Sequence, residues 1–253
     1  MYRHSATDEV GHMYGPNSHE VFDNALRHDK MLSYFFSYLN KKIGLKNCVI
    51  VLTADHGIAP IPEYKRKTDP EVKAVRISST EISVRATRML NNTFGETSAK
   101  WITSVIDAQI YLNRTAAKDK GVPLDIVSKI LKDSLTNDFP VDKAYIAEEL
   151  LAETDKECFC DNVKKSFYPP RAGDVLLLVT PFSIIDGSST GTNHGMPYSY
   201  DTHVPLIFSG KGIVRGEFNG EATPLDIMPT LAKILKLRIS KECQGNVLNE
   251  ALR

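Results

Sequence analysis

Hydrophobic residues recur at helical spacing between residues 17 and 44, in a stretch that begins with polar residues and ends at a glycine. The apolar positions are Val21, Ala25, Met31, Leu32, Phe35, Phe36 and Leu39. Steps of three and four residues place side chains on one face of a helix. Asn17 or Ser18 can cap the first turn, and Gly44 ends the pattern. The pattern predicts an amphipathic helix.

Three apolar runs have the length of strands. They are "CVIVL" (48–52), "DVLLLV" (174–179) and "HVPLIF" (203–208). Continuous apolar runs bounded by turn residues are typical of strands buried on both faces, as in parallel sheets. Because helical patterns alternate with these runs, the sequence predicts an α/β fold with a mixed, mainly parallel sheet and flanking helices.

The middle of the chain, about 62–170, mixes further short elements. The polar, proline-rich stretch 60–70 predicts a surface loop, and 81–95 predicts a short strand followed by a helix. The segment 123–135 predicts an amphipathic helix. One more strand is predicted from the alternating residues Ile106, Ala108, Ile110 and Leu112. We therefore expect an inserted α/β subregion at about 62–170.

The start of the last helix is marked by "TPLDIMPTLAKIL". Thr223 is placed to cap the helix, with Pro224 at the first helical position and Asp226 near the third. Pro229 lacks an N–H group, so it must kink the helix or restart it.

Net charge and the distribution of apolar residues indicate which partners and which cellular locations suit this protein. Lys plus Arg and Asp plus Glu number 31 each, so the net charge gives no support to a nucleic-acid or anionic-membrane partner. No run approaches the roughly 18 apolar residues of a membrane span. The first residues lack the apolar segment of a secretory signal, so the protein is cytoplasmic or its true beginning is missing.

The four cysteines do not decide the cellular compartment. Cys158 and Cys160 are one residue apart, which is neither a redox nor a zinc-knuckle spacing. We interpret them as structural, with a disulfide to a distant residue such as Cys243 as one pairing.

Candidate chemistry lies in three polar stretches that contain histidine. In "TDEVGHMYGPNSHE", Asp8 and His12 are four residues apart, so one helical turn would bring both side chains to the same side. Gly11, Gly15 and Pro16 predict a tight loop or a single turn there. The alternative is that both are solvated loop residues.

The other two stretches follow predicted strands. In "TADHG", Asp55 and His56 stand where a strand ends, which is where open α/β sheets place their sites. The alternative for Asp55 is a cap on the next turn. In "TNHGMPYSYDTH", His194 is either a ligand or a loop histidine held by backbone carbonyl groups.

Together the three stretches supply two carboxylates and three imidazoles. This mixed set suits zinc best, and manganese or iron less well. Two such metals can hold the attacking and the leaving oxygen of a displacement at phosphorus. Hydrolysis of a phosphate ester is the chemistry that this set can serve.

The motifs resemble those of the alkaline phosphatase superfamily, above all its monomeric, phosphate-irrepressible alkaline phosphatases. The similar stretches are "DEVGHMYGP", "TADHG", "YPPRAGDVLLLV", "HGMPYSYDTHVPLIFSG" and "PLDIMPTL". The resemblance implies that residues 1–253 are the C-terminal portion of one alkaline-phosphatase-like domain. It also implies export to the periplasm or outside the cell, and a monomer when the protein is complete.

The resemblance implies two divalent metals, most readily zinc. One would be bound by Asp8, His12 and His194, and the second by Asp55 and His56. His203 does not match a ligand position and is interpreted as a supporting residue. The substrates would be small phosphate esters, with no role for a nucleic-acid duplex and no membrane span.

The family pattern also includes residues that cannot be placed on this sequence. The nucleophilic Thr or Ser, one further metal-ligating Asp and the groups that clamp the phosphate would precede Met1. A nucleophile acts by forming a covalent intermediate, so we expect the chain alone to turn over little. Open sheet edges and exposed apolar surface predict a metastable or aggregation-prone product.

Three functions stay open at this point. The first is a phosphate-monoester hydrolase with a two-metal site. The second is a type I phosphodiesterase or nucleotide pyrophosphatase, whose "DxxGHxxGP" and "DHG" motifs are nearly the same. The third is an inactive fragment that keeps the ligands and binds only metal or a partner chain. A sulfatase or a phosphosugar mutase fits less well.

Overall fold

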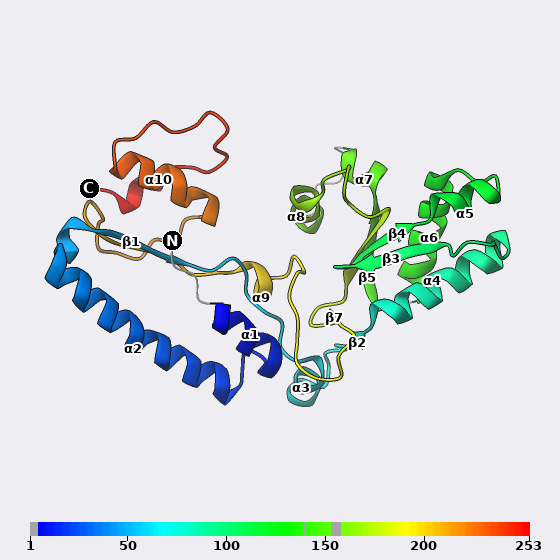
Figure 1. Ribbon diagram of the computed structural model, residues 1–253, viewed down its shortest axis with the longest axis horizontal. Coiled ribbons are helices and arrows are strands. Elements are labelled where there is room, and N and C mark those ends of the chain that lie inside the picture. The colour runs from blue at the N-terminus through cyan, green and yellow to red at the C-terminus, as the bar shows by residue number, and fades with distance from the viewer. Residues whose placement is uncertain (1–4, 139, 153–157) are drawn as a thin grey trace. The chain divides into compact units, whose positions relative to one another are not determined.

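The computed structural model describes residues 5–138, 140–152 and 158–253. The chain divides into two compact units: one joins Met1–Val21 to Ile58–Thr202, and the other joins Phe22–Gly57 to His203–Arg253. Helices and strands alternate within them, which confirms the predicted α/β class (Figure 1). Each unit is therefore assembled from segments that are far apart in the sequence.

The first unit contains a four-stranded antiparallel sheet. Its strands, in order across the sheet, are β3 (Ile102–Ile106), β4 (Gln109–Leu112), β6 (Val175–Val179) and β5 (Val141–Ile146). β3 and β4 form a hairpin, so the prediction of one strand through both is wrong. The turn residues Asp107 and Ala108 have φ values of 46° and 63°. These values are typical of a type I′ turn, where Asn-Gly is usual, so the missing glycine hid the turn from the sequence.

The helices of the first unit are α1 (Ser5–Tyr14), α3 (Pro62–Thr68), α4 (Ser79–Phe94), α5 (Arg114–Asp119), α6 (Leu124–Asp138), α7 (Ala147–Leu151), α8 (Cys158–Ser166) and α9 (Ser199–Thr202). Of these, α4, α6 and α7 pack against the four-stranded sheet, and further helices lie in the segments that lead to and from it. The Ser78 hydroxyl caps α4 by accepting the Glu81 N–H. The strand predicted within 81–95 is therefore helical. α3 replaces the loop predicted at 60–70, with Pro62 in its first turn.

Both faces of the sheet are covered, which explains the uninterrupted apolar run of β6. Val175 and Leu177 pack into one core cluster with residues of α4 and α6, while Leu176 and Leu178 pack into a second cluster that includes Tyr198. Side chains alternate between the two faces along a strand, so all of β6 is buried. The predicted parallel pairing is wrong here, because an antiparallel strand covered on both faces has the same pattern.

Among the described residues of the first unit, β2 (Arg76–Ile77) pairs parallel with β7 (Ile184–Ile185). The inserted subregion at about 62–170 stays a prediction. Its strands β3, β4 and β5 share their sheet with β6, which follows it in the sequence.

The second unit contains a two-stranded sheet and two helices. β1 (Val49–Thr53) pairs antiparallel with β8 (Leu206–Gly210). The prediction of parallel, buried strands is wrong for this pair, since β1 is half-buried to exposed. The helices are α2 (His19–Lys42) and α10 (Ile227–Ile234), and three short 3₁₀ turns complete the unit: η1 (Leu45–Asn47), η2 (Pro224–Asp226) and η3 (Asn249–Ala251).

The predicted start of the last helix is confirmed. The Asp226 carboxylate accepts the Thr223 N–H at 2.7 Å, with Pro224 leading the 3₁₀ turn η2. α10 follows from Ile227, which leaves Pro229 in its first turn. An N–H group in a first turn has no partner within the helix, so the chain restarts a helix before Pro229 and loses no hydrogen bond.

The predicted helix over 17–44 is confirmed as α2, yet none of its residues is buried. Exposed apolar side chains stand at i, i+3, i+4 and i+7 along it: Met31, Tyr34, Phe35 and Tyr38. In the described part of the chain, β1 and β8 pair only with each other, so each has an open edge. Such surfaces favour association, and the aggregation of the isolated chain stays a prediction with this structural basis.

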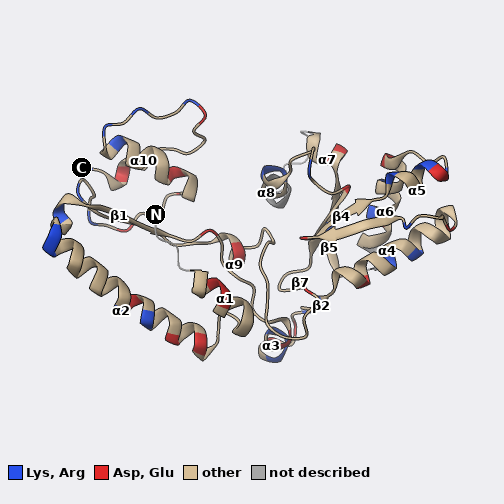
Figure 2. Ribbon diagram, in the orientation of Figure 1, with Lys and Arg blue, Asp and Glu red and all other residues tan. Residues whose placement is uncertain are grey.

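Charged residues of both signs are interspersed along α2 of the second unit and along α4 of the first (Figure 2). No helix in the described ranges is long and apolar enough to cross a membrane.

Cys48 and Cys243 are free thiols, so the expected disulfide to Cys243 is not formed. The side chains of Cys158 and Cys160 lie outside the described residues.

Truncating a core side chain tests the packing of the first unit. Leu135 is completely buried in the same cluster as Trp101, the single tryptophan of the chain. Leu135→Ala should lower the free energy of unfolding of this unit by about 2–5 kcal/mol, through lost contacts and a cavity. Urea titration followed by Trp101 fluorescence measures the change. Leu151→Ala, at a position that is 62% exposed, is the control, and equal losses in both variants would contradict the described core.

Candidate metal centre

Asp8 and His12 lie one turn apart on α1. The Asp8 Oδ1 atom is 3.5 Å from the His12 Nε2 atom. The loop or single turn predicted here is wrong, because the helix runs through Gly11 and ends before Gly15. The expectation that four-residue spacing brings the two side chains together is confirmed.

His194 joins this pair from the loop that follows β7. Its Nε2 atom is 4.0 Å from Asp8 Oδ1, and its ring centroid is 5.0 Å from that of His12. The three side chains are 27–35% exposed, so they are open to an ion and shielded from bulk water on one side. The structure thus brings together three predicted ligands from positions far apart in the sequence.

The backbone of Thr192 fixes the orientation of His12. The His12 Nδ1 atom lies 2.9 Å from the Thr192 carbonyl oxygen, and the Thr192 N–H donates to the His12 carbonyl at 2.8 Å. A carbonyl oxygen can only accept, so Nδ1 carries the hydrogen. In the neutral ring, Nε2 then has a lone pair that points toward Asp8 and His194. This is the tautomer that a metal ligand needs.

Gly191 allows the loop to approach α1 this closely. It has a φ value of 76°, and a Cβ atom at this position would lie 2.4 Å from the His12 carbonyl oxygen. A larger residue would therefore push apart the two segments that carry the histidines.

The buried carboxylate of Asp201 holds the chain on the other side of His194. It accepts the N–H groups of Gly195 and Met196 at 2.9 and 2.8 Å. Asp201 is 4% exposed and belongs to α9. Bonds of this charge-assisted kind are stronger than neutral ones, so the residues directly after His194 have little freedom.

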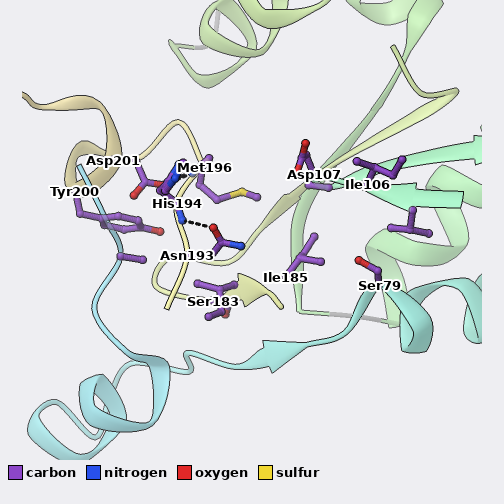
Figure 3. Close-up of a pocket in the computed structure, with 15 residues that line it drawn as sticks. Ser79, Ile106, Asp107, Ser183, Ile185, Asn193, His194, Met196, Tyr200 and Asp201 are labelled. Carbon is purple, nitrogen blue, oxygen red and sulfur yellow. Dashed lines mark hydrogen bonds between the residues drawn. The ribbon is translucent and has the colours of Figure 1, made fainter. Parts of the chain in front are cut away.

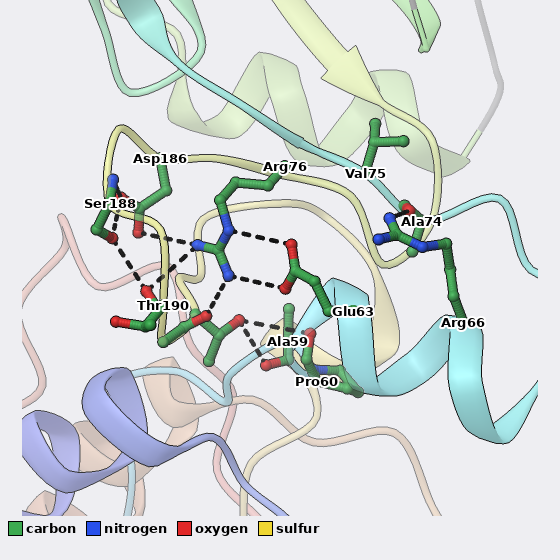
Figure 4. A network of polar contacts seen from close by, with 12 residues as sticks. Ala59, Pro60, Glu63, Arg66, Ala74, Val75, Arg76, Asp186, Ser188 and Thr190 are labelled. Carbon is green, nitrogen blue, oxygen red and sulfur yellow. Dashed lines mark hydrogen bonds and ion pairs between the residues drawn. The ribbon is translucent and has the colours of Figure 1, made fainter.

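Arg76 anchors the loop that leads to Thr192 (Figure 4). Its guanidinium group donates to both carboxylate oxygens of Glu63, at 3.3 and 3.0 Å, and to the Thr190 and Gly191 carbonyl oxygens, at 3.4 and 2.6 Å. The Asp186 carboxylate lies 3.9 Å away. Because Arg76 is 10% exposed at its side chain, this network is a rigid support rather than a surface pair.

The network also shifts the ionisation of Glu63. Burial raises its pKa, and the hydrogen bonds and charge of Arg76 more than offset that effect, so the pKa is lower than usual. A carboxyl whose pKa is lower in the folded chain stabilises the fold at pH values above the unfolded pKa. That stabilisation is lost as the pH falls through the pKa that Glu63 has in the folded chain.

Asp55 and His56 belong to the second unit and follow β1, as predicted. Their closest atoms, Asp55 Oδ1 and His56 Nε2, are 3.9 Å apart. The His56 Nδ1 atom lies 2.9 Å from the Gly57 carbonyl oxygen, so Nδ1 again carries the hydrogen. The two residues are described within their own unit, and their role beside Asp8, His12 and His194 stays a prediction. His203 also lies in the second unit.

Sequence reasoning did not assign roles to Thr192, Arg76 and Asp201. Thr192 and Asp201 lie within the stretch "TNHGMPYSYDTH", but its pattern indicates only the histidines as metal ligands. Arg76 lies more than a hundred residues before His194, and no local pattern links it to the loop that it supports.

Comparison with known proteins places this geometry in a family. The model of the type I phosphodiesterase / nucleotide pyrophosphatase family matches residues 1–201. The alkaline phosphatase PafA of Elizabethkingia meningoseptica is 30% identical over 98% of this chain and 44% of its own length. The alkaline phosphatase PhoV of Synechococcus elongatus is 29% identical over the same shares. The chain thus spans less than half the length of these curated relatives.

Solved structures agree with the sequence comparison. The crystal structure of wild-type PafA matches 98% of this chain and 46% of its own chain, with a TM-score of 0.87 and 29% identity. Human ectonucleotide pyrophosphatase / phosphodiesterase 5 matches 96% of this chain and 55% of its own, with a TM-score of 0.61 and 16% identity. The second match shows the fold alone.

Changing Arg76 tests whether its fork of hydrogen bonds supports the loop. Arg76→Lys keeps the charge but cannot serve all four acceptors, so it should lower the free energy of unfolding of the first unit by about 1–3 kcal/mol. Urea titration with Trp101 fluorescence gives the value. Arg85→Lys alters a more exposed pair with Glu81 on α4 and should cost about 0.5 kcal/mol or less. Similar losses in the two variants would count against a supporting role for Arg76.

Proposed function

Because the chain belongs to the type I phosphodiesterase / nucleotide pyrophosphatase family, within the alkaline phosphatase superfamily, we propose that it forms part of the active site of a metal-dependent phosphate-monoester hydrolase. The observation that carries this proposal is the convergence of Asp8, His12 and His194. Its relatives named alkaline phosphatases match it over nearly its whole length.

The chemistry of the three side chains supports a zinc ion. Ligand atoms bound tetrahedrally at 2.0–2.1 Å from zinc lie about 3.3 Å from one another. The Asp8 oxygen is 3.5 Å from His12 Nε2 and 4.0 Å from His194 Nε2, so each histidine nitrogen lies close to the spacing at which it could share an ion with Asp8. The Nδ1–H group that His12 gives to Thr192 leaves Nε2 as the donor atom. One carboxylate and two imidazoles are a usual zinc set.

This proposal assigns a second metal to Asp55 and His56. A further Asp ligand would come from a segment that the relatives have and that this chain does not span. Bound metals of this kind hold the attacking and leaving oxygens of the reaction and stabilise the charge that forms on them. The chain's own contribution is to orient the ligands, through Thr192, Asp201 and Gly57. A Thr or Ser nucleophile from the same outside segment completes the proposal.

The rival activity is cleavage of phosphate diesters, which the description of the matching family supports. We favour monoesters because the relatives at about 30% identity carry the name alkaline phosphatase. The third alternative is a chain that binds metal without turnover.

Export from the cytoplasm and a monomeric whole protein are further parts of the proposal, and both rest on the family resemblance.

Zinc affinity tests the ligand set on this chain directly. His12→Ala and His194→Ala should each weaken zinc binding at least about 10-fold, since a lost ligand costs more than a lost supporting residue. Competition with a chromogenic chelator measures the dissociation constant. His28→Ala on α2 is the control and should bind zinc as the unaltered chain does. Unchanged affinity in both site variants would contradict the proposed centre.

Hydrolysis assays distinguish the two activities from each other and from the inactive alternative. We expect zinc-dependent cleavage of p-nitrophenyl phosphate when the chain is joined to the preceding part of a relative such as PafA, and little with the chain alone, because the nucleophile comes from outside. Asp55→Ala should abolish the activity of the joined protein. Preference for bis-p-nitrophenyl phosphate would establish the diesterase instead. Zinc binding without cleavage of either ester would leave the inactive alternative.

A further inference from the structure

A pocket opens beside His194 in the first unit, with a volume of about 560 Å³. Its walls come from two parts of that unit (Figure 3). The tip of the β3–β4 hairpin, with Ile106 and Asp107, forms one side, and the loop that carries Asn193, His194 and Met196 forms the other. The pocket is therefore continuous with the candidate metal centre through His194.

The lining combines apolar and polar side chains. Its larger aliphatic and thioether side chains are Val105, Ile106, Ile184, Ile185 and Met196, while Ser79, Ser183, Asn193 and Tyr200 supply polar groups. Ile106 is 54% exposed at the hairpin tip, although leaving a large apolar side chain in water forgoes the free energy of burying it. A hydrocarbon group in the pocket would cover this side chain.

The charge of the lining has one sign. Asp107 and Asp201 contribute carboxylates, and no lysine or arginine occurs among the described residues that line the pocket. Asp201 is committed to the Gly195 and Met196 N–H groups, which leaves Asp107, exposed at the hairpin tip, as the carboxylate available to a ligand. Such a lining repels anionic groups and attracts cationic ones.

The turn conformation fixes the backbone at the hairpin tip. Asp107 and Ala108 both have positive φ values, as a type I′ hairpin turn requires. The Ala108 carbonyl accepts the Leu177 N–H at 2.8 Å, which ties the turn to β6. The turn therefore sets the position of the Ile106 and Asp107 side of the pocket.

We propose that this pocket binds the alcohol part of a phosphate ester, and that it selects apolar alcohols that are neutral or positively charged over anionic ones. The inference rests on the proposed function in one respect: the phosphate of such an ester would lie at His194, and its alcohol would extend toward Ile106 and Asp107. Substrates with an anionic leaving group, such as nucleoside triphosphates, are poor ligands for this lining.

The pocket can be tested without metal, phosphate or turnover. Three probes share one phenyl group and differ in charge: 2-phenylethylamine, 2-phenylethanol and 3-phenylpropionate. The full chain, labelled at its isoleucine and methionine methyl groups and freed of metal with a chelator, is titrated with each probe by NMR. We expect shifts at Ile106, Ile185 and Met196, with the amine bound roughly five-fold more tightly than the carboxylate.

Two variants assign the binding to the pocket. Asp107→Asn should remove most of the preference for the amine, while Asp29→Asn on α2 should leave it intact. Ile106→Ala should weaken the binding of all three probes about three-fold or more, because it removes apolar contact area. Ile106 is exposed, so this variant should fold, and the unshifted methyl groups of buried Ile82 and Ile110 report that it has.

The result that overturns the proposal is the absence of shifts at the pocket methyl groups with all three probes at millimolar concentration. Tighter binding of the carboxylate than of the amine would also overturn it. A separate measurement tests the metal centre: unchanged zinc affinity in His12→Ala and His194→Ala would contradict it. Each of the two proposals can therefore fail while the other stands.

Discussion

The pair of hydrogen bonds between His12 and Thr192 is the contact on which the candidate centre depends. It joins the backbone of α1 to a loop 180 residues away, and it sets the hydrogen of the His12 ring on Nδ1. One contact therefore determines both which histidines meet and which nitrogen of His12 faces Asp8. Gly191 makes the approach sterically feasible, because a side chain at that position would occupy the space of the His12 carbonyl group.

Two buried charged groups keep this loop in place on either side of Thr192. Arg76 binds the loop before it, and Asp201 binds the loop after it. Both belong to segments that pack against the core of the first unit, since Arg76 lies on β2 and Asp201 on α9 beside the cluster of Tyr198 and Leu178. A buried charge without partners is costly, so these residues stabilise the fold and the ligand geometry through the same contacts.

Local chemistry explains what the sequence could predict. The helix over 17–44, the Thr223 start and the meeting of Asp8 with His12 follow from spacing and capping within a few residues. Strand pairing did not follow, because the run at Val175–Val179 has the same pattern in any sheet that is covered on both faces. The Asp107–Ala108 turn lacks its usual glycine, and Arg76 acts across the fold, so neither left a local signal.

The most direct test of the account is the tautomer and metal bonding of the His12 ring, observed by ¹⁵N NMR of the side-chain nitrogens as zinc is added. The structure predicts that Nδ1 carries the hydrogen before and after zinc, and that the Nε2 resonances of His12 and His194 move to values typical of metal-bound nitrogen. Hydrogen on Nε2 of His12 in the zinc-free protein, or Nε2 resonances that ignore saturating zinc, would contradict the central claim that Thr192 orients His12 as a ligand.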